Sequence, residues 1–229
     1  MGQYQIECIS LGKRYTRNNQ VVNAVYDINL SIRRNEMVIL KGRSGAGKST
    51  LLNLMSGLIK PTYGKVLIDN ICISELPNGA LSEMMLNRIG IIFQSFNLLP
   101  TYTIFENIEI AIIPKGSKRE FSEDVIMSLL DQFDLKNKAH SLPSELSIGQ
   151  QQKVAIIRTL IKQPSIIFAD EPTGSLDDET AGEIIENLLY LKREKKVTLV
   201  IATHGNIPEN FADKVYEIEN GRIKLDSGN

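Results

Sequence analysis

The fold is decided by residues 42–50, which read Gly-Arg-Ser-Gly-Ala-Gly-Lys-Ser-Thr. This stretch follows a short apolar run at 38–40 and precedes a helical run at 51–55. The spacing matches G-x-x-x-x-G-K-[ST] between a strand and a helix, the context in which this pattern forms a phosphate-binding loop. A glycine-rich structural turn is the alternative, and the full eight-residue match in this context favours the phosphate-binding loop. The sequence therefore predicts a nucleotide site.

Each residue type in the loop has a physical role. Glycines allow the backbone to turn tightly so that successive N–H groups point at phosphate oxygens, and the following helix N-terminus adds partial positive charge. Lys48 supplies an ammonium for the β- and γ-phosphates, and the hydroxyl of Ser49 can ligate Mg²⁺. The predicted nucleotide contacts from this loop are Gly42, Arg43, Ser44, Gly45, Ala46, Gly47, Lys48, Ser49 and Thr50.

The rest of the chain alternates between strand and helix patterns. Continuous apolar runs at 38–40, 89–93, 166–169 and 198–202 are typical of strands buried on both faces of a parallel sheet. Residues 178–195 have the apolar spacing of an amphipathic helix. Together they predict a layered α/β fold.

Two segments differ from this alternation. Residues 3–10 and 25–32 predict an antiparallel hairpin around a turn at 17–20. Residues from about 96 to 160 are mainly helical in pattern and predict a helical subdomain inserted into the α/β core.

The run at 165–172, Ser-Ile-Ile-Phe-Ala-Asp-Glu-Pro, places two carboxylates at the end of an apolar strand. Parallel sheets bind ligands at this end of their strands. Asp170 is suited to holding Mg²⁺ through water, and Glu171 to taking a proton from an attacking water. A solvated strand end is the alternative, and the phosphate-binding loop makes the catalytic interpretation the stronger one.

Composition narrows the possible partners. The chain has 229 residues, with 26 Lys and Arg against 27 Asp and Glu and a net charge of −1. Binding to nucleic acid without sequence preference requires a basic excess, so we expect no nucleic-acid partner. Cys8 and Cys72 have no metal-type spacing, and no apolar run approaches the roughly 20 residues of a membrane-spanning helix. We expect a soluble, intracellular chain with free thiols.

Residues 146–158, Leu-Ser-Ile-Gly-Gln-Gln-Gln-Lys-Val-Ala-Ile-Ile-Arg, resemble the signature of ATP-binding-cassette (ABC) ATPases. The other motifs follow the family's order: Gln94 after a strand, then the signature, Asp170-Glu171, Ser-Leu-Asp at 175–177, and His204 after a strand. The resemblance implies a P-loop NTPase (RecA-like) core with an N-terminal antiparallel β-subdomain. It also implies one domain over 1–229, with the core and β-subdomain in 1–95 and 160–229 and the helical signature subdomain at about 96–160.

The resemblance also implies roles for single residues. Tyr15 would stack on adenine, although an ordinary surface or core tyrosine is the alternative. Gln94 would contact Mg²⁺ and the attacking water and sense the membrane partner. His204 would hydrogen-bond the γ-phosphate and orient the water and Glu171, where a structural histidine is the alternative. Asp177 would couple two active sites.

Residues 147–150 open a predicted helix, which gives the chain a second helix-N-terminal anion site. One nucleotide cannot readily occupy both sites if they lie in different subdomains. The simplest arrangement is a head-to-tail homodimer on ATP binding, in which Ser147, Gly149 and Gln150 of one subunit contact the nucleotide held by Lys48 of the other.

Three positions depart from the family pattern. Ile148 replaces a signature glycine, and a positive φ there would strain a β-branched residue by about 1 kcal/mol or more. We therefore expect an ordinary φ at Ile148 and weaker or slower closure over ATP. Gly205 stands where many relatives have Asp, and Arg43 replaces a common proline.

Residues 88–100 and 103–108 resemble the ATPases of macrolide exporters, lipoprotein-releasing complexes and antimicrobial-peptide exporters. This implies an ATPase that drives export or extracytoplasmic mechanical work by a separately encoded permease, with Phe96, Leu98, Leu99 and Phe105 either in a groove for that permease or in the helical subdomain's own core. The chain would lie at the inner face of the membrane and touch it only through the permease.

Other functions stay open. An amino-acid-type importer shares part of the pattern. A soluble ABC ATPase acting on DNA or ribosomes would need a coiled-coil insertion or a second cassette. A small GTPase would need a guanine-reading motif, and the nearest stretch at 137–140, Asn-Lys-Ala-His, lacks its carboxylate.

Overall fold

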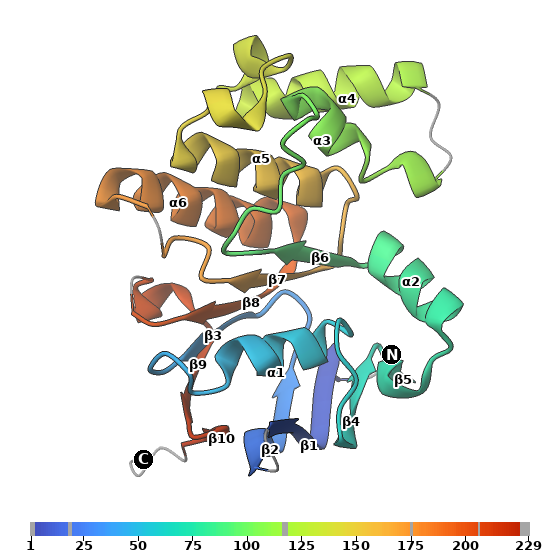
Figure 1. Ribbon diagram of the computed structural model, residues 1–229, viewed down its shortest axis with the longest axis vertical. Coiled ribbons are helices and arrows are strands. Elements are labelled where there is room, and N and C mark those ends of the chain that lie inside the picture. Colours follow the sequence, from blue (N-terminus) through green and yellow to red (C-terminus); the bar gives the residue numbers. More distant parts are fainter. Residues whose placement is uncertain (1–2, 18–19, 116–118, 175, 206, 225–229) are drawn as a thin grey trace.

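The computed structural model describes residues 3–17, 20–115, 119–174, 176–205 and 207–224. It contains an antiparallel sheet and a mainly parallel sheet, with helix α1 (Lys48–Met55) beside both and the remaining helices beyond the parallel sheet or at its edge (Figure 1). This agrees with the predicted fold class. The division at 95 and 160 stays a prediction.

The antiparallel sheet has the strand order β2-β1-β4-β5. Its bounds are β1 Ile6–Arg17, β2 Gln20–Ile32, β4 Tyr63–Ile68 and β5 Ile71–Cys72. Strands β1 and β2 form the predicted hairpin, and both extend further toward the turn than the sequence pattern indicated. Part of the predicted turn, residues 18–19, lies outside the described residues.

The second sheet has the order β10-β9-β3-β8-β7-β6, and all of its pairs are parallel except β10 with β9. The bounds are β3 Met37–Lys41, β6 Ile89–Ile92, β7 Ile166–Asp170, β8 Thr198–Thr203, β9 Lys214–Glu219 and β10 Arg222–Ile223. The four apolar runs of the sequence all lie in this sheet.

The parallel sheet separates two hydrophobic cores. Because successive side chains of a strand point to opposite faces, Val38 and Leu40 of β3 pack with α1 and the antiparallel sheet. Met37 and Ile39 pack on the other side, against the helices beyond the sheet. The continuous apolar pattern of β3 is therefore explained by burial on both faces.

The remaining helices are α2 (Asn78–Asn87), α3 (Ile104–Glu109), α4 (Arg119–Gln132), α5 (Ile148–Leu160) and α6 (Asp178–Lys195). Short 3-10 turns lie at Ile73–Glu75, Ile113–Lys115, Lys136–Lys138, Pro143–Glu145 and Glu209–Phe211. Helix α6 has the predicted bounds. Helices α3, α4 and α5 fall within the predicted helical segment and lie together above the sheet in Figure 1. Within the described ranges, no helix combines the length and apolar character needed to cross a bilayer.

Candidate functional site

The loop between β3 and α1 requires glycine at Gly47. This residue is the N-cap of α1 and has φ +106°, a backbone conformation that side chains disfavour. A Cβ atom there would also lie 2.2 Å from the carbonyl oxygen of Ala24. No side chain caps the helix, so the first N–H groups of α1 remain directed at the loop, as an anion site requires.

Lys48 is the first residue of α1, and its side chain is only 6% exposed. Its ammonium donates to the carbonyl oxygens of Gly42 at 2.9 Å and Arg43 at 3.3 Å. The same nitrogen lies 3.6 Å from Oε1 of Glu171. The loop therefore folds around a buried cation.

Ser49 and Asp170 come together although they are far apart in the sequence. The Ser49 hydroxyl donates to Oδ1 of Asp170 over 2.9 Å. Burial raises the pKa of Asp170, and the neighbouring Glu171 carboxylate acts in the same direction. A divalent cation at this point would offset the cost of burying the charged carboxylate.

Glu171 has a left-handed backbone with φ +46°, and its N–H donates to the carbonyl oxygen of Ala202 at 2.8 Å. This geometry directs the carboxylate between Lys48 on one side and His204 on the other. Nδ1 of His204 lies 2.7 Å from Oε2 of Glu171, and the backbone N–H of His204 donates to the same oxygen at 3.2 Å. Strands β7 and β8 thus bring an acid and a histidine into one cluster.

These groups face a cavity of about 490 Å³. Its lining residues are Ala24, Ser44, Gly45, Gly47, Lys48, Ser49, Thr50, Gln94, Glu171 and His204. Most of the phosphate-binding loop, including Lys48, therefore lines this cavity. The other three predicted catalytic residues, Gln94, Glu171 and His204, line it as well. The sequence did not indicate Ala24, which enters from β2.

The donor set fits Mg²⁺. Among the described residues no cluster of three or more His, Cys, Asp or Glu side chains could hold a metal by itself. Mg²⁺ does not need such a cluster, because it usually combines one or two carboxylates with waters and substrate phosphates. The Ser49 hydroxyl and the Asp170 carboxylate supply suitable oxygen atoms beside the phosphate-binding loop.

The comparisons with known proteins agree with this site. The family model "ABC transporter" matches residues 25–174. The chain belongs to the ABC transporter family. As a member of that family it binds and hydrolyses ATP.

Individual relatives cover nearly the whole chain. The ABC transporter ATP-binding protein YtrE of Bacillus subtilis is 40% identical over 94% of this chain and 92% of its own length. The lipoprotein-releasing system ATP-binding protein LolD of Rickettsia bellii is 37% identical, covering 94% and 96%. Among solved structures, the ATP-binding cassette MJ0796 of Methanocaldococcus jannaschii, a dimer in a post-hydrolysis state with ADP and Pi, aligns with a TM-score of 0.90 at 35% identity, covering 96% and 97%.

The remaining predicted residues do not line the cavity. Gly42, Arg43 and Ala46 belong to the same loop, and Asp170 accepts a hydrogen bond from Ser49, which does line the cavity. Tyr15 lies on β1 and is 44% exposed, with the ammonium of Lys13 5.4 Å from its ring centre. The ABC signature lies elsewhere, at the start of α5.

Ser147 is the N-cap of α5, as the sequence predicted. Its hydroxyl accepts from the N–H of Gln150 at 3.3 Å, and the Gln150 side chain accepts from the N–H of Ser147 at 3.0 Å. Ile148 follows as the first helical residue and is absent from the described residues with positive φ. The expected ordinary φ at Ile148 is therefore confirmed, and its side chain is 53% exposed.

The fold requires glycine at position 149 of the signature, because a side chain there has no room. A Cβ atom on Gly149 would lie 2.3 Å from Cγ2 of Thr180 in the first turn of α6. Thr180 is held in turn by Asp177, whose carboxylate accepts from its N–H at 2.9 Å and its hydroxyl at 2.8 Å. These hydrogen bonds lower the pKa of Asp177. Asp177 is thus the N-cap of α6, a structural role that the sequence reading missed.

A further residue was missed at the other end of α5. The guanidinium of Arg158 donates to the carbonyl oxygen of Asn97 at 2.6 Å and to that of Phe96 at 2.5 Å. Both acceptor residues have positive φ, which turns their carbonyls toward the helix. Burial lowers the pKa of Arg158. The sequence did contain a signal for this contact, because Arg158 directly follows the apolar run at 154–157. A charged side chain beside buried residues needs hydrogen-bond acceptors close to it.

Proposed function

We propose that this chain powers export, or mechanical work outside the cytoplasm, by acting on a permease that is a separate polypeptide. The observation that carries the proposal is the full-length similarity to ATP-binding subunits, one of which is named for lipoprotein release. The chain would then lie at the inner face of the membrane and contact it only through the permease.

The site supports a definite division of roles. Lys48 and the N–H groups of the loop hold the phosphates of ATP, and Glu171 accepts a proton from the attacking water. Gln94 and His204, which both line the cavity, orient that water and the γ-phosphate. Mg²⁺ would be held by Ser49, Gln94 and Asp170 and would neutralise charge on the phosphates.

The signature supports catalysis in a dimer. Ser147, Gly149 and Gln150 lie outside the lining of the cavity that contains Lys48. They also begin a helix, whose N-terminus favours negative charge, and the Ser147 hydroxyl, which accepts from Gln150, still has a proton to donate to a phosphate. A head-to-tail dimer brings the signature of one subunit to the nucleotide of the other and so uses both anion sites. MJ0796, a relative of similar length, has been solved as a dimer.

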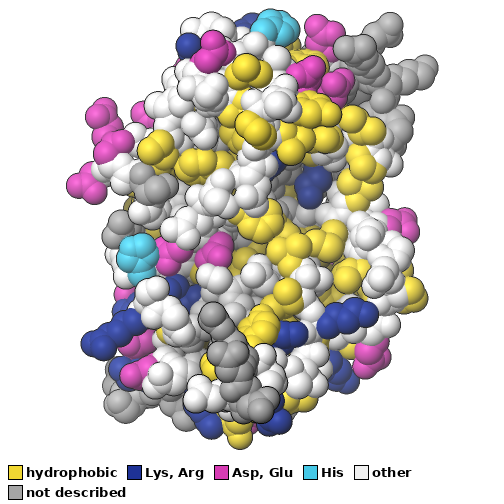
Figure 2. Space-filling view, viewed as in Figure 1, with side chains coloured by type: hydrophobic (Ala, Val, Ile, Leu, Met, Phe, Trp, Pro, Cys, Tyr) yellow, Lys and Arg dark blue, Asp and Glu magenta, His cyan; other side chains and the backbone are white. Residues whose placement is uncertain are grey.

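The permease contact is proposed on the helical side. Leu98 and Phe105 are partly buried against the core, so they pack the fold itself. Leu99 and Tyr102, in contrast, are exposed. Figure 2 shows hydrophobic side chains gathered over α3 and the segment after it, where Ile110 and Ile113 are also exposed. This surface is close in sequence to Gln94 and suits a partner that senses the nucleotide site.

A complementation experiment tests the shared site. Lys48→Ala and Ser147→Arg each inactivate every site of their own homodimer. In a mixed dimer, one site carries both changes and the other carries neither, so ATP hydrolysis should recover in a mixture of two inactive variants. Phosphate release at several mixing ratios measures this recovery. Failure to recover, with both variants folded, would contradict a site shared between subunits.

Purification of the chain with its membrane partner tests the transport role. The expected partner has few membrane helices and a large extracytoplasmic domain, and it should raise ATP hydrolysis by the chain in lipid nanodiscs. A partner of the importer type, or a soluble one such as ribosomes, would contradict the proposed export role. It would leave the assignment of the ATPase site unchanged.

A further inference from the structure

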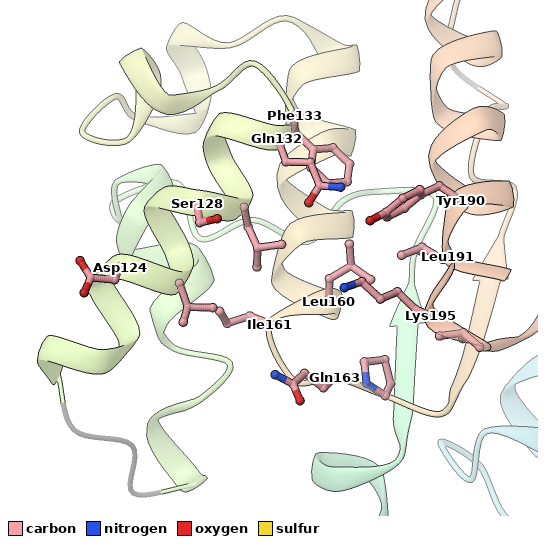
Figure 3. A pocket seen from close by; sticks show the side chains of 14 residues that line it. Asp124, Ser128, Gln132, Phe133, Leu160, Ile161, Gln163, Tyr190, Leu191 and Lys195 are labelled. Carbon is pink, nitrogen blue, oxygen red and sulfur yellow. The ribbon is translucent and has the colours of Figure 1, made fainter. Parts of the chain in front are cut away.

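A second cavity, of about 630 Å³, lies between α4, the end of α5 and the end of α6 (Figure 3). The residues that line it are Asp124, Val125, Ser128, Leu129, Gln132, Phe133, Leu160, Ile161, Gln163, Pro164, Tyr190, Leu191, Lys195 and Val197. None of them lines the cavity that contains Lys48 and Glu171. The ATPase reaction therefore gives no account of this second cavity.

The two cavities lie at opposite ends of the same strands. Pro164 precedes β7 and Val197 precedes β8, whereas Glu171 and His204 directly follow these strands. A five-residue strand such as β7 spans roughly 17 Å. A molecule in the second cavity would therefore not compete with ATP for space.

The inner wall of the second cavity is apolar. Phe133, Ile161, Leu191 and Val197 are each less than 9% exposed and belong to the core beyond the sheet. Helix α4 presents residues at a spacing of four, 125 and 129, so that one of its faces forms a side of the cavity. This wall would bury the apolar body of a ligand.

The only cation among the lining residues, Lys195, lies on α6 together with Tyr190, whereas α4 contributes the polar side chains of Asp124, Ser128 and Gln132. In Figure 3 the hydroxyl of Tyr190 and the side chain of Lys195 point into the cavity. Lys195 is the last residue of α6, and its ammonium has no carboxylate within 4.0 Å among the described residues. The only carboxylate in the lining, Asp124, lies on α4 at the far side of the view. An unpaired cation beside an apolar wall favours a ligand with a negatively charged head.

We propose that this cavity binds a small amphipathic anion, with a carboxylate at Lys195 and Tyr190 and an apolar chain against α4 and α5. Ligand cavities commonly measure about 300–1,000 Å³ and combine apolar walls with a few polar groups, as this one does. The ligand would contact α4, in the helical segment, and α6, on the parallel sheet. It would therefore bind one relative placement of these two parts in preference to others.

Decanoate below its micelle concentration is a suitable probe for the full-length protein. Methyl NMR should show saturable shifts at Leu129, Ile161 and Leu191. Decanol and decylamine have the same chain with a neutral or a cationic head, and they should bind at least tenfold more weakly. Equal binding of all three probes, or the absence of saturable shifts at these methyl groups, would overturn the proposal.

Two variants of Lys195 and one matched control distinguish the loss of the Lys195 charge from a general effect of the substitution on the protein. Lys195→Gln should weaken decanoate binding about tenfold, and Lys195→Arg should largely retain it. Lys196→Gln removes the adjacent cation, which does not line the cavity, and should leave binding unchanged. Equal weakening in both Gln variants would mean that the probe senses overall charge only, and the assigned site would be wrong.

Competition with nucleotide checks the location. A saturating non-hydrolysable ATP analogue should leave decanoate bound, because the two cavities share no lining residue. Displacement of decanoate by the analogue, together with undiminished decanoate binding by Lys195→Gln, would place the anion at the phosphate-binding loop and refute the second site.

Discussion

The carboxylate of Glu171 is held by both the ring and the backbone of His204. Nδ1 of His204 lies 2.7 Å from Oε2, and the backbone N–H donates to the same atom at 3.2 Å. An ionised carboxylate accepts but does not donate hydrogen bonds, so the histidine tautomer that can pair with an ionised Glu171 is the one with its proton on Nδ1. His204 therefore fixes the direction of the proposed base before substrate arrives.

Glu171→Gln should slow ATP hydrolysis by about 10²–10⁴-fold, the range typical of a lost general base. ATP binding should persist because Lys48 and the loop are unchanged, so the ATP-bound dimer should accumulate. Phosphate release and analytical ultracentrifugation measure the two effects. Glu186→Gln, an exposed position on α6, is the control and should behave as the unmodified protein. Undiminished hydrolysis by Glu171→Gln would remove this residue from the catalytic role.

Gly149→Ala should destabilise the protein by about 1–3 kcal/mol, because its new methyl group meets Cγ2 of Thr180. Thr180→Ser removes that methyl group but keeps the hydroxyl that bonds Asp177. The double variant should therefore recover most of the lost stability. Urea unfolding of the unmodified protein, the two single variants and the double variant measures the four stabilities of this double-mutant cycle. Simple additivity of the two changes would show that the Gly149–Thr180 contact is not the cause.

Ile148→Gly should hydrolyse ATP at least as fast as the unmodified chain. Ile148 is exposed and has helical backbone angles, so the glycine does not relieve strain in the isolated subunit. Its effect is expected instead at closure, where a smaller side chain allows nearer approach of the second subunit. Steady-state ATPase rates at saturating ATP measure this, and a slower glycine variant would contradict it.

Arg158→Met should lower kcat more than it raises KM. The loss leaves the carbonyl groups of Phe96 and Asn97 without their charged donor, and the segment that carries Gln94 becomes less constrained. Stability should fall by about 2 kcal/mol. Arg158→Lys should restore only part of both losses, since an ammonium lacks the planar fork of a guanidinium. Arg193→Met, an exposed change on α6, is the control. A rise in KM alone would contradict the positioning role.

We expect Asp213 to make a contribution to the free energy of unfolding that depends on pH. Partial burial acts to raise its pKa, but hydrogen bonds from Lys192 and from the N–H of Met37, each 2.7 Å long, bring the net pKa below the ordinary 3.8. A lowered pKa in the folded state stabilises the protein above 3.8, and this stability is lost as the pH falls through the folded-state value.

Asp213→Asn should therefore cost up to about 1 kcal/mol at pH 7, a small value because the side chain is 42% exposed. The difference from the unmodified protein should shrink below pH 3.8. Urea unfolding at pH 7, 5 and 3 measures it, with Asp124→Asn as the exposed control. A difference that grows toward acid pH would have the wrong sign.

Local patterns were sufficient for much of the fold. The amphipathic spacing of 178–195 predicted α6 with its observed bounds, because the apolar face of the helix is encoded within the segment itself. The phosphate-binding loop was predictable for the same reason. The strand order of the parallel sheet was not, because β9 joins it by pairing with β3, which lies far away in the sequence.

The missed parts of the site depend on backbone groups. Ala24 enters the nucleotide cavity from β2 because its carbonyl oxygen approaches Gly47. Arg158 is bound by two carbonyls whose direction follows from positive φ values at Phe96 and Asn97. Every residue has a carbonyl group, so sequence letters cannot single out which ones will serve as acceptors.

Helix α5 carries the Ser147 cap at one end and the Arg158 contacts near the other. Arg158 lies 11 positions after Ser147, which corresponds to about 16 Å along a helix axis. A helix of this length can move as a rigid body, so a displacement at one end moves the other end while the hydrogen bonds within the helix are kept. Any shift in the segment after Gln94 would therefore tilt the helix and move the signature. In a dimer, the membrane partner of one subunit would thereby adjust the timing of hydrolysis on the other.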